Sequence, residues 1–142
     1  MGKNGVTGII VPLDAESVHL VFHHRPVVPL FVESFPDDLE VGDRAFLYVS
    51  GGSIIDGEGG VSSITREPVG EVRRYGDQLC LTREELDTYV AVSRKRESDE
   101  MLVLKLDEPT KYIKPMKCGV PITRGGVYMT AEIFFTILRE NR

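Results

Sequence analysis

The stretch VGDRAFLYVSGGSIIDGEGGVSSITREPVGEV, residues 41–72, decides the fold of this chain. It opens with a Gly-Asp turn, continues into an apolar segment over Ala45–Val49, and breaks at Ser50-Gly51-Gly52-Ser53. Aromatic and β-branched residues bounded by Gly, Asp and Pro are typical of strands, so we expect further extended segments over Gly59–Ile64 and Val69–Arg73. Glycines at the break leave backbone N–H groups free, where a small polar ligand could lie. A plain hairpin or bulge explains the same glycines.

The length and composition are those of a globular protein. The chain has 142 residues, of which 42% are hydrophobic and 27% charged, so we expect one domain over residues 1–142. No apolar run approaches the roughly 20 residues that span a bilayer, and the N-terminus lacks a signal-peptide pattern. We therefore expect a cytoplasmic protein without a membrane partner.

The net charge of -5 argues against a general nucleic-acid binder. Non-specific affinity for nucleic acids rests on neutralising phosphates with an excess of Lys and Arg. Any nucleic-acid site in this chain must therefore be a local patch.

The sequence gives little support for a metal or cofactor. Cys80 and Cys118 are too few for a disulfide framework or a four-cysteine zinc site, and Cys80 stands between two leucines, which favours the core. Glu16, His19 and His23 can share one helix face, but the Glu of a His-Glu-x-x-His hydrolase is missing. We predict neither a metal site nor a cofactor.

The first part of the chain predicts one strand and one helix. Val6–Leu13 is a strand, and Asp14 can cap a helix that extends to Phe22. Prolines in the segment 26–38 predict an extended or looping crossover. A turn is expected at Tyr75-Gly76-Asp77.

The second part predicts two further helices. Thr82-Arg83-Glu84-Glu85 has the form of a capping box and starts a helix over 83–94. After a charged loop, Met101–Leu106 is a strand that Glu108-Pro109 interrupts before an extended course resumes. Thr130 can cap a last helix.

This order of elements predicts an α+β fold. A sheet of about five or six strands in a chain of this length tends to curl into a small barrel. A flat sheet with helices on one face is the alternative.

Two segments carry a resemblance to a known superfamily. Residues 41–48 and 55–61 resemble the PUA-like superfamily, in particular its ASCH and EVE branches, with a Gly-Asp turn, a strand with an aromatic residue near its end, and a Gly-Glu start to the next strand. The helix leading to His24-Arg25-Pro26 matches the helix and basic residue common in that group. Residues 114–117 and 125–129 resemble an archaeal family of the group whose function is unassigned.

The resemblance implies a small mixed-strand PUA-like pseudo-barrel with about three short helices, whose cleft in relatives binds RNA or a modified base. The ASCH pattern Gly-x-Lys-x-x-Glu-x-Arg is absent, since Arg25 and Glu33 have the wrong spacing. The aromatic cage of the EVE branch is not traceable either, because the chain has no Trp.

Our first hypothesis is therefore an RNA-binding or modified-nucleotide-binding domain with a basic, Gly-lined cleft. Arginine suits phosphate or a base edge by its planar fork of donors, and lysines beside a tyrosine can contact phosphate while the ring stacks on a base. A surface ion pair and a lysine-protected strand edge are the structural alternatives. The residues expected to bind nucleic acid or ligand are Arg25, Ser50, Gly51, Gly52, Ser53, Tyr112, Lys114 and Lys117.

Two other functions stay open. Some ASCH relatives are hydrolases, so the same cleft could act on nucleosides or RNA, with Lys114, Thr123 and Glu58 as the residues to watch. Alternatively, an exposed sheet edge could recruit another protein or a second copy in a homodimer. The sequence contains no Ser-His-Asp ordering and no evident carboxylate pair, so it does not decide between enzyme and binding domain.

Overall fold

The computed structural model describes residues 5–36 and 38–142. Asp37, in the expected crossover, lies outside the described residues. In chain order the elements are β1 (Val6–Leu13), α1 (Ala15–Phe22), β2 (Val27–Leu30), β3 (Arg44–Val49), β4 (Ile54–Pro68), α2 (Val69–Val72), the 3₁₀ helix η1 (Arg73–Gln78), α3 (Arg83–Val92), β5 (Glu100–Lys117), β6 (Val127–Thr130) and α4 (Ala131–Glu140).

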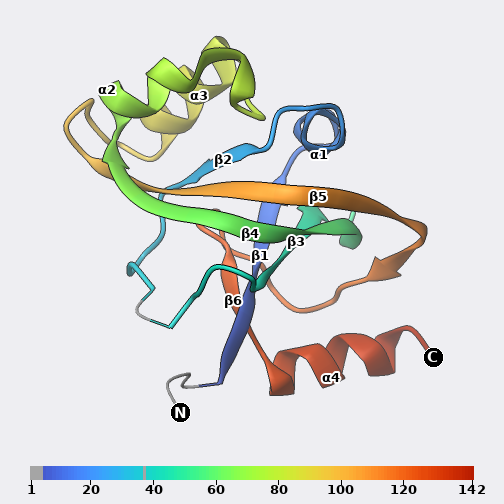
Figure 1. Ribbon diagram of the computed structural model, residues 1–142. Coiled ribbons are helices and arrows are strands. Elements are labelled where there is room, and N and C mark those ends of the chain that lie inside the picture. The colour runs from blue at the N-terminus through green and yellow to red at the C-terminus, as the bar shows by residue number, and fades with distance from the viewer. Residues whose placement is uncertain (1–4, 37) are drawn as a thin grey trace.

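The described strands form one six-stranded mixed sheet in the order β2-β5-β4-β3-β1-β6. β1 and β3 are parallel, and the other neighbours are antiparallel. The long strands β4 and β5 curve across the molecule (Figure 1). The α+β prediction is confirmed, and the curved sheet fits a small pseudo-barrel. Its described edges, β2 and β6, do not pair with each other, so the barrel is not closed.

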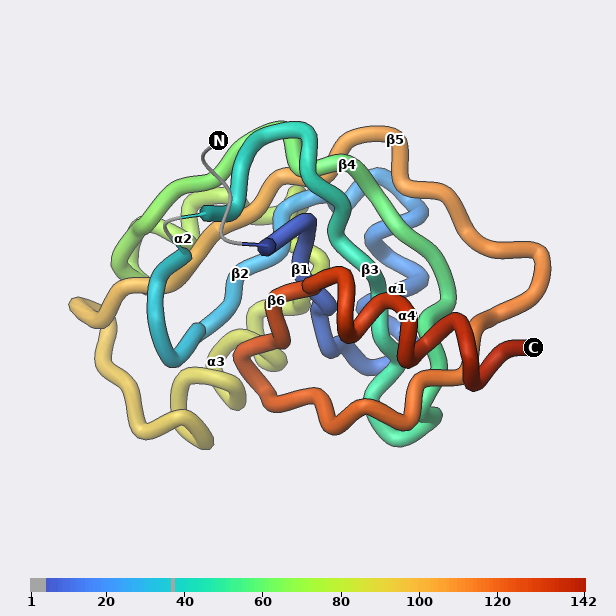
Figure 2. The backbone as a smooth tube through the Cα atoms, turned by 90° about the horizontal axis from the view of Figure 1, so that it is seen from below, coloured from blue at the N-terminus to red at the C-terminus, as the bar shows by residue number. Residues whose placement is uncertain are grey.

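Helices lie on both sides of this sheet. α1, α2 and α3 lie on one side in Figure 1, and α4 lies on the other, the side seen in Figure 2. There Ile137 of α4 packs in one cluster with Ile10 of β1 and Phe46 of β3. Three buried apolar clusters fill the space between these layers, with Leu47, Met101 and Ile137 each almost fully buried in a different one. None of the described helices is long and apolar enough to cross a membrane.

The helix caps form as predicted. Asp14 accepts a hydrogen bond from the backbone N of Ser17 at 2.7 Å, and Thr130 Oγ1 accepts from the N of Ile133 at 3.3 Å. Thr82 and Glu85 make a reciprocal capping box, with bonds of 3.1 and 2.9 Å. These bonds satisfy N–H groups that the first helical turn leaves without partners.

Strand β4, the second strand within residues 41–72, is longer than predicted. It covers Ile54–Pro68 rather than Gly59–Ile64. Glycines in its first half break the side-chain alternation that identifies a strand. In the structure they allow close packing, because a Cβ on Gly57 would overlap the carbonyl oxygen of Thr110 and the ring of Phe22.

The extended segment predicted over Val69–Arg73 is wrong. It forms α2 and the start of η1 instead. Val69 and Val72 are both fully buried three residues apart, which is helical spacing, so packing overrides the β preference of valine. The turn predicted at Tyr75-Gly76-Asp77 falls within η1, where Gly76 has a φ of 54°.

The interruption predicted at Glu108-Pro109 is a bulge within one continuous strand. β5 passes through it, and the register with β4 shifts between the pairs Glu58–Thr110 and Gly60–Asp107. Glu108 has a φ of 46°, an unusual value for a residue other than glycine. A bulge places extra residues opposite one partner without ending the ladder, and it bends the strand.

Candidate ligand pocket beside helix α3

The larger cavity lies where the end of β1 and the start of α1 meet β2 and α3. Its volume is about 500 Å³, which is in the usual range for a small-molecule site. Its apolar lining consists of Pro12, Leu13, Pro29, Leu30, Leu81 and Val92, and its polar lining of Asp14, Ser17, Ser50, Glu84, Glu85, Thr88, Tyr89 and Arg124. We call this cavity the base pocket.

The two helix starts bring carboxylates together in the base pocket. Asp14 caps α1 and Glu85 belongs to the capping box of α3, and Ser17 connects them, because its backbone N donates to Asp14 and its hydroxyl donates to Glu85. Ser17 is fully buried, and its hydroxyl donates to Glu85 at 3.4 Å. Burial opposes the charge of Asp14, but hydrogen bonds, chiefly the one from the backbone N of Ser17, outweigh it and lower the pKa of Asp14.

Tyr89 forms an aromatic part of the wall. Its hydroxyl accepts a hydrogen bond from the backbone N of Phe31 at 2.8 Å, and the two rings are tilted with centroids 5.0 Å apart. Burial raises the pKa of Tyr89, so this phenol stays neutral at physiological pH. The ring is thus fixed in place by contacts outside the pocket.

The charges of the base pocket favour a ligand that donates hydrogen bonds. Asp14, Glu84 and Glu85 contribute carboxylates, and Arg124 is the only basic residue among the described residues of the lining. A carboxylate only accepts hydrogen bonds when ionised, and apolar walls strengthen such bonds by excluding water. The pocket is therefore suited to a flat ligand with N–H groups along one edge.

A smaller cavity, which we call the arginine pocket, lies on the other side of the first turn of α3. Its volume is about 350 Å³, and its lining consists of Arg25, Arg73, Gly76, Asp77, Leu79, Leu81, Thr82, Arg83 and Leu86. The lining thus includes three arginines and one aspartate.

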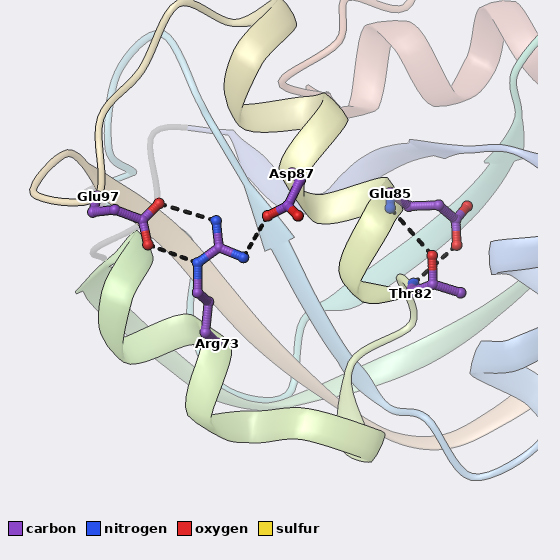
Figure 3. A network of polar contacts seen from close by, with 5 residues as sticks. All are labelled: Arg73, Thr82, Glu85, Asp87 and Glu97. Carbon is purple, nitrogen blue, oxygen red and sulfur yellow. Dashed lines mark hydrogen bonds and ion pairs between the residues drawn. The ribbon is translucent and has the colours of Figure 1, made fainter.

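Arg73 is already committed to other contacts. Its guanidinium makes hydrogen bonds of 2.6 and 3.0 Å to Glu97 and one of 2.6 Å to Asp87 (Figure 3). These bonds raise the pKa of Arg73 and lower that of Glu97. Arg73 therefore ties η1 to α3 and to the loop before β5.

The residues predicted to bind a ligand do not share one cavity. Ser50 lines the base pocket and Arg25 the arginine pocket. The other six predicted residues line neither: Gly51, Gly52, Ser53, Tyr112, Lys114 and Lys117.

Those six residues lie along the β3–β4 turn and the second half of β5. The turn meets β5 where the N of Cys118 donates to the carbonyl of Ser53 at 2.8 Å. Gly51 has a φ of 86° and Ser53 a φ of 53°, so the tight turn itself requires this backbone. Lys114 and Lys117 are exposed. Their role in binding stays a prediction.

The residues suggested for hydrolysis line neither pocket. The Glu58 carboxylate accepts hydrogen bonds from Arg44 at 2.5 Å and from Tyr112 at 2.8 Å, and burial is the main reason that the pKa of Tyr112 is raised. The Thr123 hydroxyl donates to the carbonyl of Gly126 at 3.0 Å. Both side chains thus have hydrogen-bond partners within the fold.

The histidines and cysteines form no metal cluster. His19 and His23 stack with centroids 4.0 Å apart, and Nδ1 of His23 lies 2.8 Å from the carbonyl of His19. Cys80 is fully buried, as expected, and burial raises its pKa to about 12. Within residues 5–36 and 38–142, no three His, Cys, Asp or Glu side chains are placed to hold a metal ion.

Sequence reasoning missed most of the base pocket. The sequence pattern identifies Asp14 and Glu85 only as caps. The sequence signal for the pocket was the pair of acidic caps, because a cap fixes the direction of its carboxylate. Arg124 comes from a loop whose position no local pattern predicts.

Two solved structures share this fold. The crystal structure of an ASCH protein from Zymomonas mobilis matches with a TM-score of 0.72 at 12% identity, covering 94% of each chain. The N-terminal domain of McrB from Staphylothermus marinus matches with a TM-score of 0.61 at 15% identity, covering 98% of each chain. These likenesses confirm the PUA-like, ASCH-type fold implied by the sequence resemblance.

Two sequence comparisons bear on the family of this chain. A comparison with curated proteins gives no match. The family model described as a domain of unknown function, DUF365, matches residues 6–131, which is most of the chain. The chain therefore belongs to the DUF365 family.

Proposed function

We propose that this protein binds a base of RNA or of a nucleotide in the base pocket, and that Asp14 and Glu85 accept hydrogen bonds from the edge of the base. The observation that carries the proposal is the meeting of these two carboxylates in a cavity with apolar walls and an aromatic side chain. The PUA-like fold supports it, since the resemblance implies a cleft that binds RNA or a modified base.

A nucleobase matches the chemistry of this lining. Its flat faces can pack against apolar and aromatic side chains, and its edge carries N–H groups that carboxylates accept. The amino groups of cytosine, adenine and guanine each offer such donors. A phosphate group does not fit among three carboxylates, so the base pocket favours the base over the backbone.

The test is a titration of ¹⁵N-labelled protein with cytidine, adenosine, guanosine and uridine, followed by NMR. We expect the three nucleosides with amino groups to shift the amide signals of Ser17, Ser50 and Thr88 more than uridine does. New product signals in these samples would identify a hydrolase.

The variants Asp14→Asn and Glu85→Gln remove each charge while keeping a capping side chain, because Asn is as good an N-cap as Asp and Gln can replace Glu in a capping box. A hydrogen bond to a charged group contributes about 1.5–3 kcal/mol, so each variant should weaken binding about tenfold or more.

Asp107→Asn is the matched control, because Asp107 is exposed on β5 and lines neither pocket. It should bind like the wild type. The proposal is wrong if no nucleoside shifts the pocket signals. It is also wrong in its assignment of the carboxylates if both variants bind as tightly as Asp107→Asn.

A further inference from the structure

The two pockets are neighbours across the first turn of α3. Leu81 lines both cavities. Glu84 and Glu85 line the base pocket, while Thr82 and Arg83 line the arginine pocket. A ligand that extended from one pocket to the other would have to pass this turn. The two halves of such a ligand would meet opposite charges.

Two of the three arginines are available for a ligand. The only ion pair of Arg25 within the described residues is with Asp77 at 3.8 Å, and the side chain of Asp77 is fully exposed. Solvent-exposed pairs of this kind contribute little and exchange readily. Arg83 makes no ion pair within the described part of the chain.

The backbone holds Arg25 at the edge of the cavity. Its N–H donates to the carbonyl of Leu20 at 3.1 Å, just after the end of α1, and Pro26 follows it. The side chain is only 30% exposed, so much of its length packs against the protein. Arg73, bound to two carboxylates, supports the wall formed by η1 and α3.

We propose that the arginine pocket holds a phosphate group of the nucleotide whose base occupies the base pocket, with Arg25 and Arg83 as its ligands. This inference rests on the proposed function. A guanidinium presents paired N–H donors that match phosphate oxygens, and two guanidiniums with weak or no ion pairs attract an anion. The preferred ligand is thus a nucleotide or an RNA segment rather than a free nucleoside.

The test compares affinities by calorimetry at fixed salt. The probes are the four nucleosides, their 3′- and 5′-monophosphates, and inorganic phosphate alone. We expect at least one monophosphate to bind about tenfold more tightly than its nucleoside, the gain of a charge-assisted contact. Whether the 3′- or the 5′-monophosphate binds more tightly shows on which side of the sugar the arginine pocket lies.

The variants Arg25→Gln and Arg83→Gln should each abolish most of this tenfold preference. Arg139→Gln is the matched control, since Arg139 is exposed on α4, on the other side of the sheet, and its hydrogen bond is to Thr136. It should keep the preference. Circular dichroism spectra would establish that all variants are folded.

The outcomes separate the two proposals. If nucleosides bind in the base pocket and no monophosphate binds more tightly, the phosphate site is wrong and the base pocket stands. If the preference persists in both Arg25→Gln and Arg83→Gln, the assigned residues are wrong. If neither nucleosides nor monophosphates bind, the proposed function fails and the phosphate site fails with it.

Discussion

At the scale of single residues, Asp14 caps α1 and is also proposed to bind the base, and we predict a pH-dependent stability from it. Burial opposes its charge, but hydrogen bonds, chiefly the one from the backbone N of Ser17, lower its pKa in the folded protein. The ionised form therefore stabilises the fold at all pH values above the unfolded pKa of about 3.9. This contribution is lost as the pH falls through the lower folded-state pKa.

The measurement is the melting temperature of wild-type protein and of Asp14→Asn from about pH 7 to about pH 3. Other carboxylates titrate in both proteins, so the difference between them isolates Asp14. We expect the advantage of the wild type to shrink at the acidic end. A difference that is constant over the whole range would contradict the lowered pKa.

At the scale of elements, α3 organises both pockets, and we predict that its capping box stabilises the protein. Thr82 and Glu85 satisfy each other's backbone N–H groups at its first turn. Thr82→Ala removes one of these bonds and should lower the free energy of unfolding by about 1 kcal/mol. Thr82→Ser keeps the hydroxyl, so its free energy of unfolding should be close to that of the wild type. Urea denaturation measures both.

Thr136→Ala is the control for this prediction. Its hydroxyl donates to the carbonyl of Glu132 one turn back in α4, a bond that adds little to helix stability. Its removal should change the free energy of unfolding by less than about 0.5 kcal/mol. The role of the capping box would be refuted if Thr82→Ala and Thr136→Ala were equally stable.

The contact between α1 and the β4–β5 pair gives a third prediction. A Cβ on Gly57 would overlap the backbone of Thr110 and the ring of Phe22. Gly57→Ala should therefore destabilise the protein by about 1–3 kcal/mol, the usual cost of overpacking.

Gly70→Ala is the matched substitution for Gly57→Ala. Gly70 lies in α2, and the nearest atom to an added Cβ is the carbonyl oxygen of Glu97 at 3.8 Å. We expect this variant to be as stable as the wild type or slightly more so, because Ala is the better helix former. Thermal melts of the two variants decide the point, and equal melting temperatures would show that the close approach at Gly57 is not tight.

At the scale of the whole molecule, the sequence predicts local features better than assembled ones. The caps at Asp14, Thr82 and Thr130 depend on residues three apart, so their pattern is visible in the sequence. The helix at Val69 and Val72 was missed because its valines favour strands until burial decides.

The base pocket could not be predicted as a unit. It is assembled from lining residues within five separate parts of the chain, 12–17, 29–30, 50, 81–92 and 124, which only the tertiary fold brings together. The Gly-rich break at Ser50–Ser53 was the most conspicuous candidate in the sequence. In the structure Gly51 has the positive φ of a tight turn, and of these four residues Ser50 alone lines either of the two pockets described above.

The overall charge leads to the last prediction, on the salt dependence of RNA binding. The net charge of -5 opposes broad contact with phosphates, so affinity should rest on the base pocket and a few arginines. For single strands, each neutralised phosphate adds about 0.7 to the slope of log K against log salt. One or two phosphates at Arg25 and Arg83 therefore predict a slope of about 1 in magnitude.

Fluorescence anisotropy of a labelled single-stranded RNA across a salt series measures this slope, and the double variant Lys114→Gln/Lys117→Gln distinguishes the two binding surfaces. If RNA lies along the second half of β5, as the sequence suggested, this variant lowers the slope by about 1. If RNA lies across α3, the double lysine variant leaves the slope unchanged, while Arg83→Gln lowers the slope. A slope several times larger in the wild type would contradict the assignment to two arginines, because it requires more phosphate contacts than the arginine pocket provides.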